Sequence, residues 1–125
     1  MATLIDLPTR RDPRGALTVI DGVLPFPVRR VYYIYECSGQ PRGGHRHVKT
    51  YQALICVRGT CTVDWDNGQK SGTVVLDVPA RLLRVPPEDW HSMRDMTPDT
   101  MLLVLASEPY DPRDYITKGY DDDRV

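Results

Sequence analysis

The sequence contains no apolar run long enough to cross a membrane as a helix. Its longest such run, Met101–Ala106 (MLLVLA), has the length of a β-strand, far short of the roughly 20 residues that a span requires. Residues 1–15 also lack the apolar segment of a secretory signal. We therefore expect a cytoplasmic protein that makes no membrane contact.

The chain has almost no excess of charge of either sign. Its 125 residues include 16 Lys and Arg against 17 Asp and Glu, which gives a formal net charge of −1. This balance provides no general attraction to nucleic acid or to a membrane surface, so we expect neither partner. Any anion must be bound by basic side chains gathered locally.

The chain has only three cysteines, which is an odd number. Cys37, Cys56 and Cys61 do not have the spacing of a metal site. Cys56 and Cys61 could face each other across a hairpin, so one interpretation is a cross-strand disulfide. The preferred interpretation is that these are small buried thiols in a reducing cytoplasm.

Most of the sequence consists of short strand-like segments separated by turn signals. Residues 28–35 are rich in β-branched and aromatic side chains. Residues 52–58 and 60–65 flank Gly59, which predicts a hairpin, and residues 66–69 (DNGQ) predict a tight turn. Further strands are expected over residues 73–78, 81–85 and 101–106.

These segments predict an all-β chain folded as a sandwich or barrel. We expect a single domain over residues 1–125, with the barrel over roughly 14–107 and a C-terminal tail over 108–125. The tail should contain one short helical turn near residues 112–116, with Asp111 as N-cap and Pro112 at the first helical position. The acidic end, residues 121–125, should be frayed.

Two of the three histidines alternate in the stretch GGHRHVK. Residues two apart on a strand point to the same face, so His45 and His47 should project together. The third, His91, follows in PPEDWH. Imidazoles can accept and return protons near neutral pH. Three histidines can also bind Zn²⁺ or Fe²⁺, and the remaining alternative is that they are interior polar groups without a function.

The arrangement resembles the two motifs of the cupin superfamily. In the first motif a glutamate follows a histidine pair and precedes a turn glycine; here Gln52 has the glutamate position and Gly59 follows. In the second motif, around His91, Glu88 replaces a glycine and Asp95 an asparagine. The resemblance implies a cupin-type β-barrel (jelly roll). Because a neutral glutamine is a poorer ligand than a carboxylate, we expect no bound metal.

A closer resemblance is to the nucleotide-sugar 3,4-ketoisomerases. It covers the chain from Arg14 to about Tyr120 and includes the motifs RVYY, PRGxHxHxK, PxxWH and LASxxYDxxDYI. It implies a homodimer that needs no cofactor. The implied reaction converts dTDP-4-keto-6-deoxy-D-glucose to the dTDP-3-keto-6-deoxyhexose through an enediol, in deoxyamino-sugar biosynthesis.

The resemblance also implies catalytic roles. It assigns the base to His45, while His47 orients the sugar oxygens or relays the second proton. Tyr33 is the expected hydrogen-bond donor to the enediolate. Tyr35 shares its strand face with Tyr33, whereas Tyr32 points to the opposite face, and alternation alone does not show which face is inward.

The implied substrate also requires cations for its pyrophosphate. The expected substrate-binding residues, besides Tyr35, are Arg14, Arg30, Arg42, Lys49, Arg84 and His91. Arg46 stands between the paired histidines where this family has a small residue. It should face away from them and have little effect on the proton chemistry.

Two other functions fit the same histidines. One is a metal-dependent cupin, such as a small dioxygenase, with His45, His47 and His91 as ligands. The other is a non-catalytic sugar-binding cupin.

Overall fold

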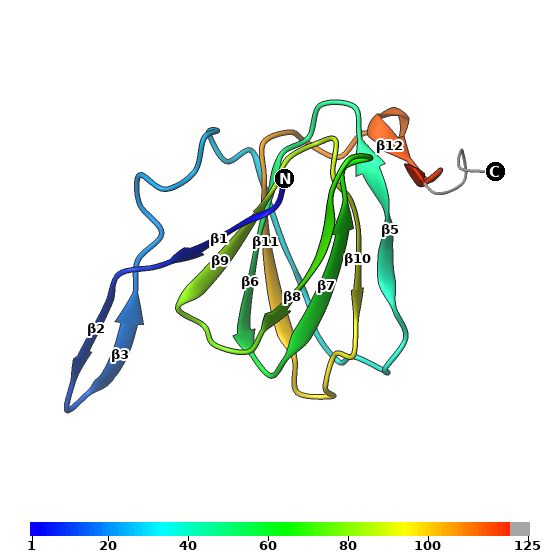
Figure 1. The fold of residues 1–125 in the computed structure, drawn as a ribbon. Helices are drawn as coiled ribbons and strands as arrows, with labels where there is room; N and C mark the ends of the chain where they lie inside the picture. Colours follow the sequence, from blue (N-terminus) through cyan, green and yellow to red (C-terminus); the bar gives the residue numbers. More distant parts are fainter. Residues whose placement is uncertain (121–125) are drawn as a thin grey trace.

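The computed structural model describes residues 1–120, which form two five-stranded antiparallel sheets packed face to face (Figure 1). The first sheet has the order β1-β9-β6-β11-β4. Its strands are β1 (Thr3–Asp6), β9 (Arg81–Val85), β6 (Gln52–Arg58), β11 (Met101–Ala106) and β4 (Arg30–Ile34). The frayed end expected at residues 121–125 lies outside the described residues.

The second sheet has the order β12-β5-β10-β7-β8. Its strands are β12 (Tyr115–Ile116), β5 (Arg42–His47), β10 (Trp90–Arg94), β7 (Cys61–Asp66) and β8 (Ser71–Leu76). The all-β fold expected from the sequence is confirmed. The strands β1, β10 and β12 were not expected, because at least half of the residues of the short strands β1 and β10 are polar and β12 has only two residues.

The main core lies between the sheets and follows the two-residue period of the strands. Leu54 and Cys56 from β6 meet Val63 and Met93 from the opposite sheet there. The alternate residues of the first sheet, such as Ile55, point outward into a second apolar cluster. That cluster is covered in part by the loop that carries Val23, Leu24 and Phe26.

A two-stranded hairpin, β2 (Thr9–Asp12) and β3 (Gly15–Thr18), projects away from both sheets (Figure 1). All of its strand residues except Thr18 are exposed. Its sequence shows no alternation of apolar and polar side chains, because neither face of the hairpin is buried in this chain.

Glycines permit two close approaches that shape the barrel. Gly59 has a φ of +77° in the turn between β6 and β7, and a Cβ there would lie 2.6 Å from the hydroxyls of Thr97 and Thr100. Gly43 has a φ of +82°, and a Cβ there would lie 2.9 Å from the His91 carbonyl oxygen. Gly43 therefore lets β5 approach β10 closely, at a point where the register shifts.

The predicted C-terminal helical turn is confirmed as a short 3₁₀ helix, η1 (Pro112–Asp114). The Asp111 side chain accepts a hydrogen bond from the Arg113 amide, and Pro112 occupies the first turn. Among residues 1–120, no helix is long and apolar enough to span a membrane.

All three cysteines are free thiols, which answers the question left open by their spacing. Burial raises the pKa of Cys56 to about 11 and that of Cys61 to about 12. Both thiols therefore stay protonated and unreactive near neutral pH.

Candidate active site

The three imidazoles gather on the inner face of the second sheet. His45 and His47 lie two residues apart on β5, and His91 on β10 is paired directly with His45. The ring centroid of His45 lies 4.9 Å from that of His47 and 5.2 Å from that of His91. The common face predicted for His45 and His47 is therefore the interior one.

Asp114 at the end of η1 orients His47. Its Oδ2 lies 2.9 Å from His47 Nδ1 and also accepts a hydrogen bond from the Thr50 hydroxyl. Its Oδ1 accepts the Lys49 amide at 2.8 Å. Burial alone would raise the pKa of Asp114, but the hydrogen bonds from Thr50, Lys49 and His47 together lower it. The side chain is therefore a carboxylate at neutral pH.

The ionised carboxylate fixes the tautomer of His47. A carboxylate can only accept hydrogen bonds, so the His47 proton sits on Nδ1 and the lone pair on Nε2. Nε2 has no hydrogen-bond partner within residues 1–120, and the Gln52 side chain lies near His47. His47 thus has one nitrogen held in place and one available to a ligand.

Burial keeps all three imidazoles neutral. It lowers the pKa of His91 to about 4, and His91 Nδ1 lies 3.1 Å from the Asp89 carbonyl oxygen. Burial, followed by the nearby charge of His47, lowers the pKa of His45. For His47, burial lowers the pKa and outweighs the opposing effect of Asp114. Neutral imidazoles are the form that can accept a proton.

Two tyrosines and an arginine complete the inner surface. The Tyr115 ring on β12 lies 4.8 Å from the His45 ring and 4.7 Å from the His47 ring, centroid to centroid. Arg30 on β4 approaches the Tyr115 hydroxyl at 3.4 Å, and its guanidinium lies over the Tyr32 ring at 5.2 Å. Tyr32 accepts a hydrogen bond from the Gln52 amide at 3.2 Å. Arg30 therefore lies close to the histidines, and its role in substrate binding stays a prediction.

The orientation expected for Tyr33 needs correction. Residues on β4 alternate, and Arg30, Tyr32 and Ile34 are the ones turned toward the barrel interior. Tyr33 lies on the outer face, where its side chain is 60% exposed, and Tyr35 is 55% exposed with its ring 5.7 Å from that of Tyr33. Neither side chain reaches the histidines of its own chain.

The expected phosphate-binding residues are distributed unevenly. Arg42, at the start of β5, is exposed. Burial raises the pKa of Tyr32, and the charge of Arg42 opposes this only weakly. The Lys49 side chain is exposed in the loop after β5 and lines a surface hollow with Tyr110 and Arg113. Lys49 contributes its backbone amide, and not its ammonium group, to the Asp114 network.

Two other predicted basic contacts are absent from the histidine cluster. Arg84 points to the outer face of the first sheet, because the neighbouring Leu83 and Val85 fill the core between the sheets. Arg14 lies in the turn of the β2–β3 hairpin, where it pairs with Asp12 at 2.6 Å and its side chain is 90% exposed. The structure therefore corrects the placement of Arg84 and puts Arg14 far along a projecting element (Figure 1).

Asp114 and Tyr115 were not among the predicted site residues. Both belong to the quoted motif LASxxYDxxDYI, so the motif did contain the signal. Their roles could not be assigned because contact with His47 depends on the return of the C-terminal segment to the edge of β5. Within residues 1–120, no group of three His, Cys, Asp or Glu side chains is arranged to hold a metal ion.

Comparison with known proteins places this site in a family. The family model described as "FdtA: WxcM-like, C-terminal" matches residues 1–122. The chain belongs to this family. It is 44% identical over 113 residues to the TDP-4-oxo-6-deoxy-alpha-D-glucose-3,4-oxoisomerase of Aneurinibacillus thermoaerophilus, a match that covers 88% of this chain and 81% of the relative.

Solved structures of FdtA-like ketoisomerases have the same fold. One is the 3,4-ketoisomerase QdtA from Thermoanaerobacterium thermosaccharolyticum, solved as a histidine-to-asparagine mutant in complex with TDP-4-keto-6-deoxyglucose. It aligns with a TM-score of 0.89 and 37% sequence identity, and the match covers 98% of this chain and 92% of QdtA. The TDP-quinovose 3,4-ketoisomerase WlaRB from Campylobacter jejuni gives a TM-score of 0.90 and 33% identity over 97% and 95%. The predicted family, the cupin-type fold and the classification as an isomerase are confirmed.

Proposed function

We propose that this protein is a sugar 3,4-ketoisomerase that converts dTDP-4-keto-6-deoxy-D-glucose to the dTDP-3-keto-6-deoxyhexose, without a metal or other cofactor. The observation that carries this proposal is the pair of neutral imidazoles on one inner strand face, one of them held by a buried carboxylate. The names of the relatives support the same substrate class. The product would supply a deoxyamino-sugar pathway.

The reaction moves two protons, and the site has two neutral imidazoles for them. One proton goes from carbon 3 to carbon 4, and the other from the oxygen on carbon 3 to the oxygen on carbon 4. His45 removes the carbon-3 proton and returns it to carbon 4 of the enediol. His47 accepts the hydroxyl proton on its free Nε2 and passes it to the other oxygen, while Asp114 stabilises the transient imidazolium.

The negative charge of the enediolate needs donors fixed in place beforehand. Tyr115 lies against both imidazoles, and Arg30 lies beside its hydroxyl. The Nε of Arg30 is buried and has no hydrogen-bond partner within residues 1–120. Together these groups provide a donor and a positive charge close to His45. The buried ring of His91 packs beside that of His45.

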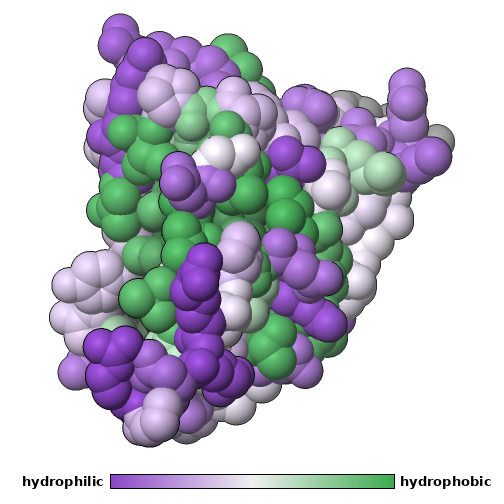
Figure 2. All heavy atoms as spheres, turned by 90° about the vertical axis from the view of Figure 1, so that its left-hand side faces the viewer, coloured by the Kyte–Doolittle hydropathy of each residue, from purple (hydrophilic) through white to green (hydrophobic). Residues whose placement is uncertain are grey.

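The proposal includes a homodimer, for which two surface features give support. The outer face of the first sheet exposes apolar side chains, including Val31 at 55%, Tyr33 at 60% and Val57 at 41%. Figure 2 shows that apolar side chains gather over much of the face from which the hairpin projects. A second copy would cover this surface, and the hairpin would carry Arg14 to the partner's substrate. Free buried thiols are consistent with a cytoplasmic location.

Proton NMR in D₂O tests the chemistry. With dTDP-4-keto-6-deoxyglucose as substrate, the carbon-3 proton should exchange with solvent and the 3-keto product should form, before and after dialysis against EDTA. His45→Asn should abolish the exchange and still bind dTDP. Loss of turnover in EDTA, restored by added metal, would support the metal-dependent alternative. Binding of the sugar nucleotide without exchange would support the non-catalytic one.

Light scattering on a sizing column tests the homodimer. We expect twice the mass of one chain, and half of that mass for a variant with Val31→Glu on the outer face. Thr62→Glu on the outer face of the second sheet is the matched control and should leave the mass unchanged. A monomeric parent protein would refute the dimer but would leave the isomerase chemistry open to its own test.

A further inference from the structure

The C-terminal segment that carries Asp114 and Tyr115 has a weak attachment to the sheet. Strand β12 joins the edge of β5 through only two residue pairs, Tyr115 with His47 and Ile116 with Arg46. So short a strand forms few ladder hydrogen bonds, so other contacts must hold the segment in place. The hydrogen bonds between Asp114 and residues 47–50 hold the start of the segment. The residues that follow β12 hold its end on the outer face of the second sheet.

Arg46 makes two of these contacts, both with Tyr120. Its guanidinium carbon lies 4.2 Å from the centroid of the Tyr120 ring, and its Nη1 donates to the Tyr120 hydroxyl at 2.9 Å. That hydroxyl donates in turn to the Glu88 carbonyl at 2.7 Å. We call these three interactions the Arg46–Tyr120 clasp. Arg46 therefore faces away from the imidazoles, as the sequence indicated, and on the outer face it binds Tyr120.

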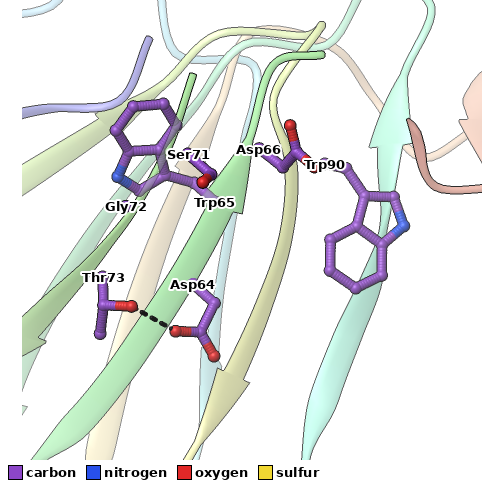
Figure 3. A pocket seen from close by; sticks show the side chains of 7 residues that line it. All are labelled: Asp64, Trp65, Asp66, Ser71, Gly72, Thr73 and Trp90. Carbon is purple, nitrogen blue, oxygen red and sulfur yellow. Dashed lines mark hydrogen bonds between the residues drawn. The ribbon is translucent and has the colours of Figure 1, made fainter. Parts of the chain in front are cut away.

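The surrounding residues are shaped to receive the segment. Trp90 Nε1 donates to the Thr117 carbonyl at 3.4 Å, and Gly119 lies against the same indole. Figure 3 shows the Trp90 and Trp65 indoles on opposite sides of β7. A Cβ at Gly68 would lie 3.0 Å from the Tyr120 ring, so the glycine leaves room for that ring. The Tyr120 ring thus fits between Arg46 and the β7–β8 turn.

We propose that Arg46 and Tyr120 are positioning residues for the isomerase: their clasp on the outer face holds the C-terminal segment so that Asp114 and Tyr115 stay against His47 and His45 on the inner face. The link between the two faces is the strand itself, because Arg46 lies between the two histidines and pairs with Ile116. The catalytic part of this inference rests on the proposed function; the structural part does not.

The clasp can be removed by single substitutions. Arg46→Ala removes the cation–π contact and the hydrogen bond, Tyr120→Phe removes only the hydroxyl, and Arg46→Lys restores a cation without the planar fork. Arg94→Ala is the matched control, because Arg94 lies on the same outer face in ion pairs with Asp64 and Asp95 and makes no contact with the clasp.

Two measurements read out the position of the segment. One is kcat and KM for the sugar nucleotide. The other is hydrogen exchange at the Val48 and Lys49 amides, which donate to Asp114 at 2.9 and 2.8 Å. For Arg46→Ala we expect kcat to fall about tenfold, KM to change less than about twofold, and exchange at both amides to speed up about tenfold. Arg46→Lys should recover part of each change, and Arg94→Ala should show none.

Unchanged exchange in Arg46→Ala and Tyr120→Phe would overturn the inference. Faster exchange with unchanged kcat, in an active parent enzyme, would overturn its catalytic part. If Arg46→Ala does not fold, the same measurements on Tyr120→Phe decide the inference, because that variant keeps the aromatic ring and removes only the hydroxyl. If the unaltered protein does not isomerise the sugar, the proposed function fails, and the exchange rates at Val48 and Lys49 still decide whether the clasp holds the segment.

Discussion

The deeply buried His91 should make the stability of this protein fall at mildly acidic pH. Its side chain is 1% exposed, and burial lowers its pKa from 6.5 to about 4. Between these two values the unfolded chain binds a proton at this position and the folded chain does not. Protonation therefore favours the unfolded state, and the contribution of His91 to stability is lost as the pH falls from 6.5 toward 4.

The size of the effect follows from the two pKa values. A pKa difference of one is equivalent to about 1.4 kcal/mol. Between pH 7.5 and pH 5, His91 alone should lower the free energy of unfolding by about 2 kcal/mol. His45 and His47 also have lowered pKa values and act in the same direction, so the whole protein should lose more than this amount.

Urea denaturation at the two pH values, at one protein concentration, measures the effect. The comparison variant is His91→Asn, whose amide can replace the imidazole Nδ1 as donor to the Asp89 carbonyl but does not titrate. The pH-dependent loss of stability should be smaller in the variant by about 2 kcal/mol. An equal loss in both proteins would show that His91 is not the buried, neutral group described here.

Three further predictions concern the catalytic step. Asp114→Asn should lower kcat by about 100-fold, because His47 loses the carboxylate that fixes its tautomer and stabilises its cation; steady-state kinetics measure this. The pH profile of kcat/KM should rise to a plateau with a midpoint below 6.5, because burial lowers the pKa of His45; a midpoint above 6.5 would contradict this. Tyr115→Phe should lower kcat at least tenfold, while Tyr33→Phe, on the outer face, should not change the rate per site.

Most of the barrel could be predicted because its strands repeat a two-residue pattern between clear turn signals. Residues 52–58 and 60–65, joined at Gly59, correspond closely to β6 and β7. The hairpin β2–β3 could not be predicted in this way, because its side chains are exposed on both faces and no burial pattern marks them. A two-residue period of apolar side chains arises where one face of a strand is buried, and the projecting hairpin buries neither face.

The candidate site was predictable in part for the same reason. Alternation correctly put His45 and His47 on one face, but it does not show which face of an edge strand is inward. Both faces of β4 carry apolar or aromatic side chains, with Tyr32 and Ile34 on the inner face and Val31 and Tyr33 on the outer face. Tyr33 was therefore preferred where Tyr32 is the inner residue.

Strand alternation also determines where the residue between the two proposed catalytic histidines points. His45 and His47 can share the inner face only if residue 46 faces outward, so that residue is free to vary without entering the cavity. In this chain it is an arginine, and it binds the segment that returns to the same strand with Asp114 and Tyr115. An outer-face residue can thus act on the inner face by holding an edge strand in place. Replacing it with a small residue would leave every inner side chain unaltered, so a drop in turnover would have to arise from the position of the C-terminal segment.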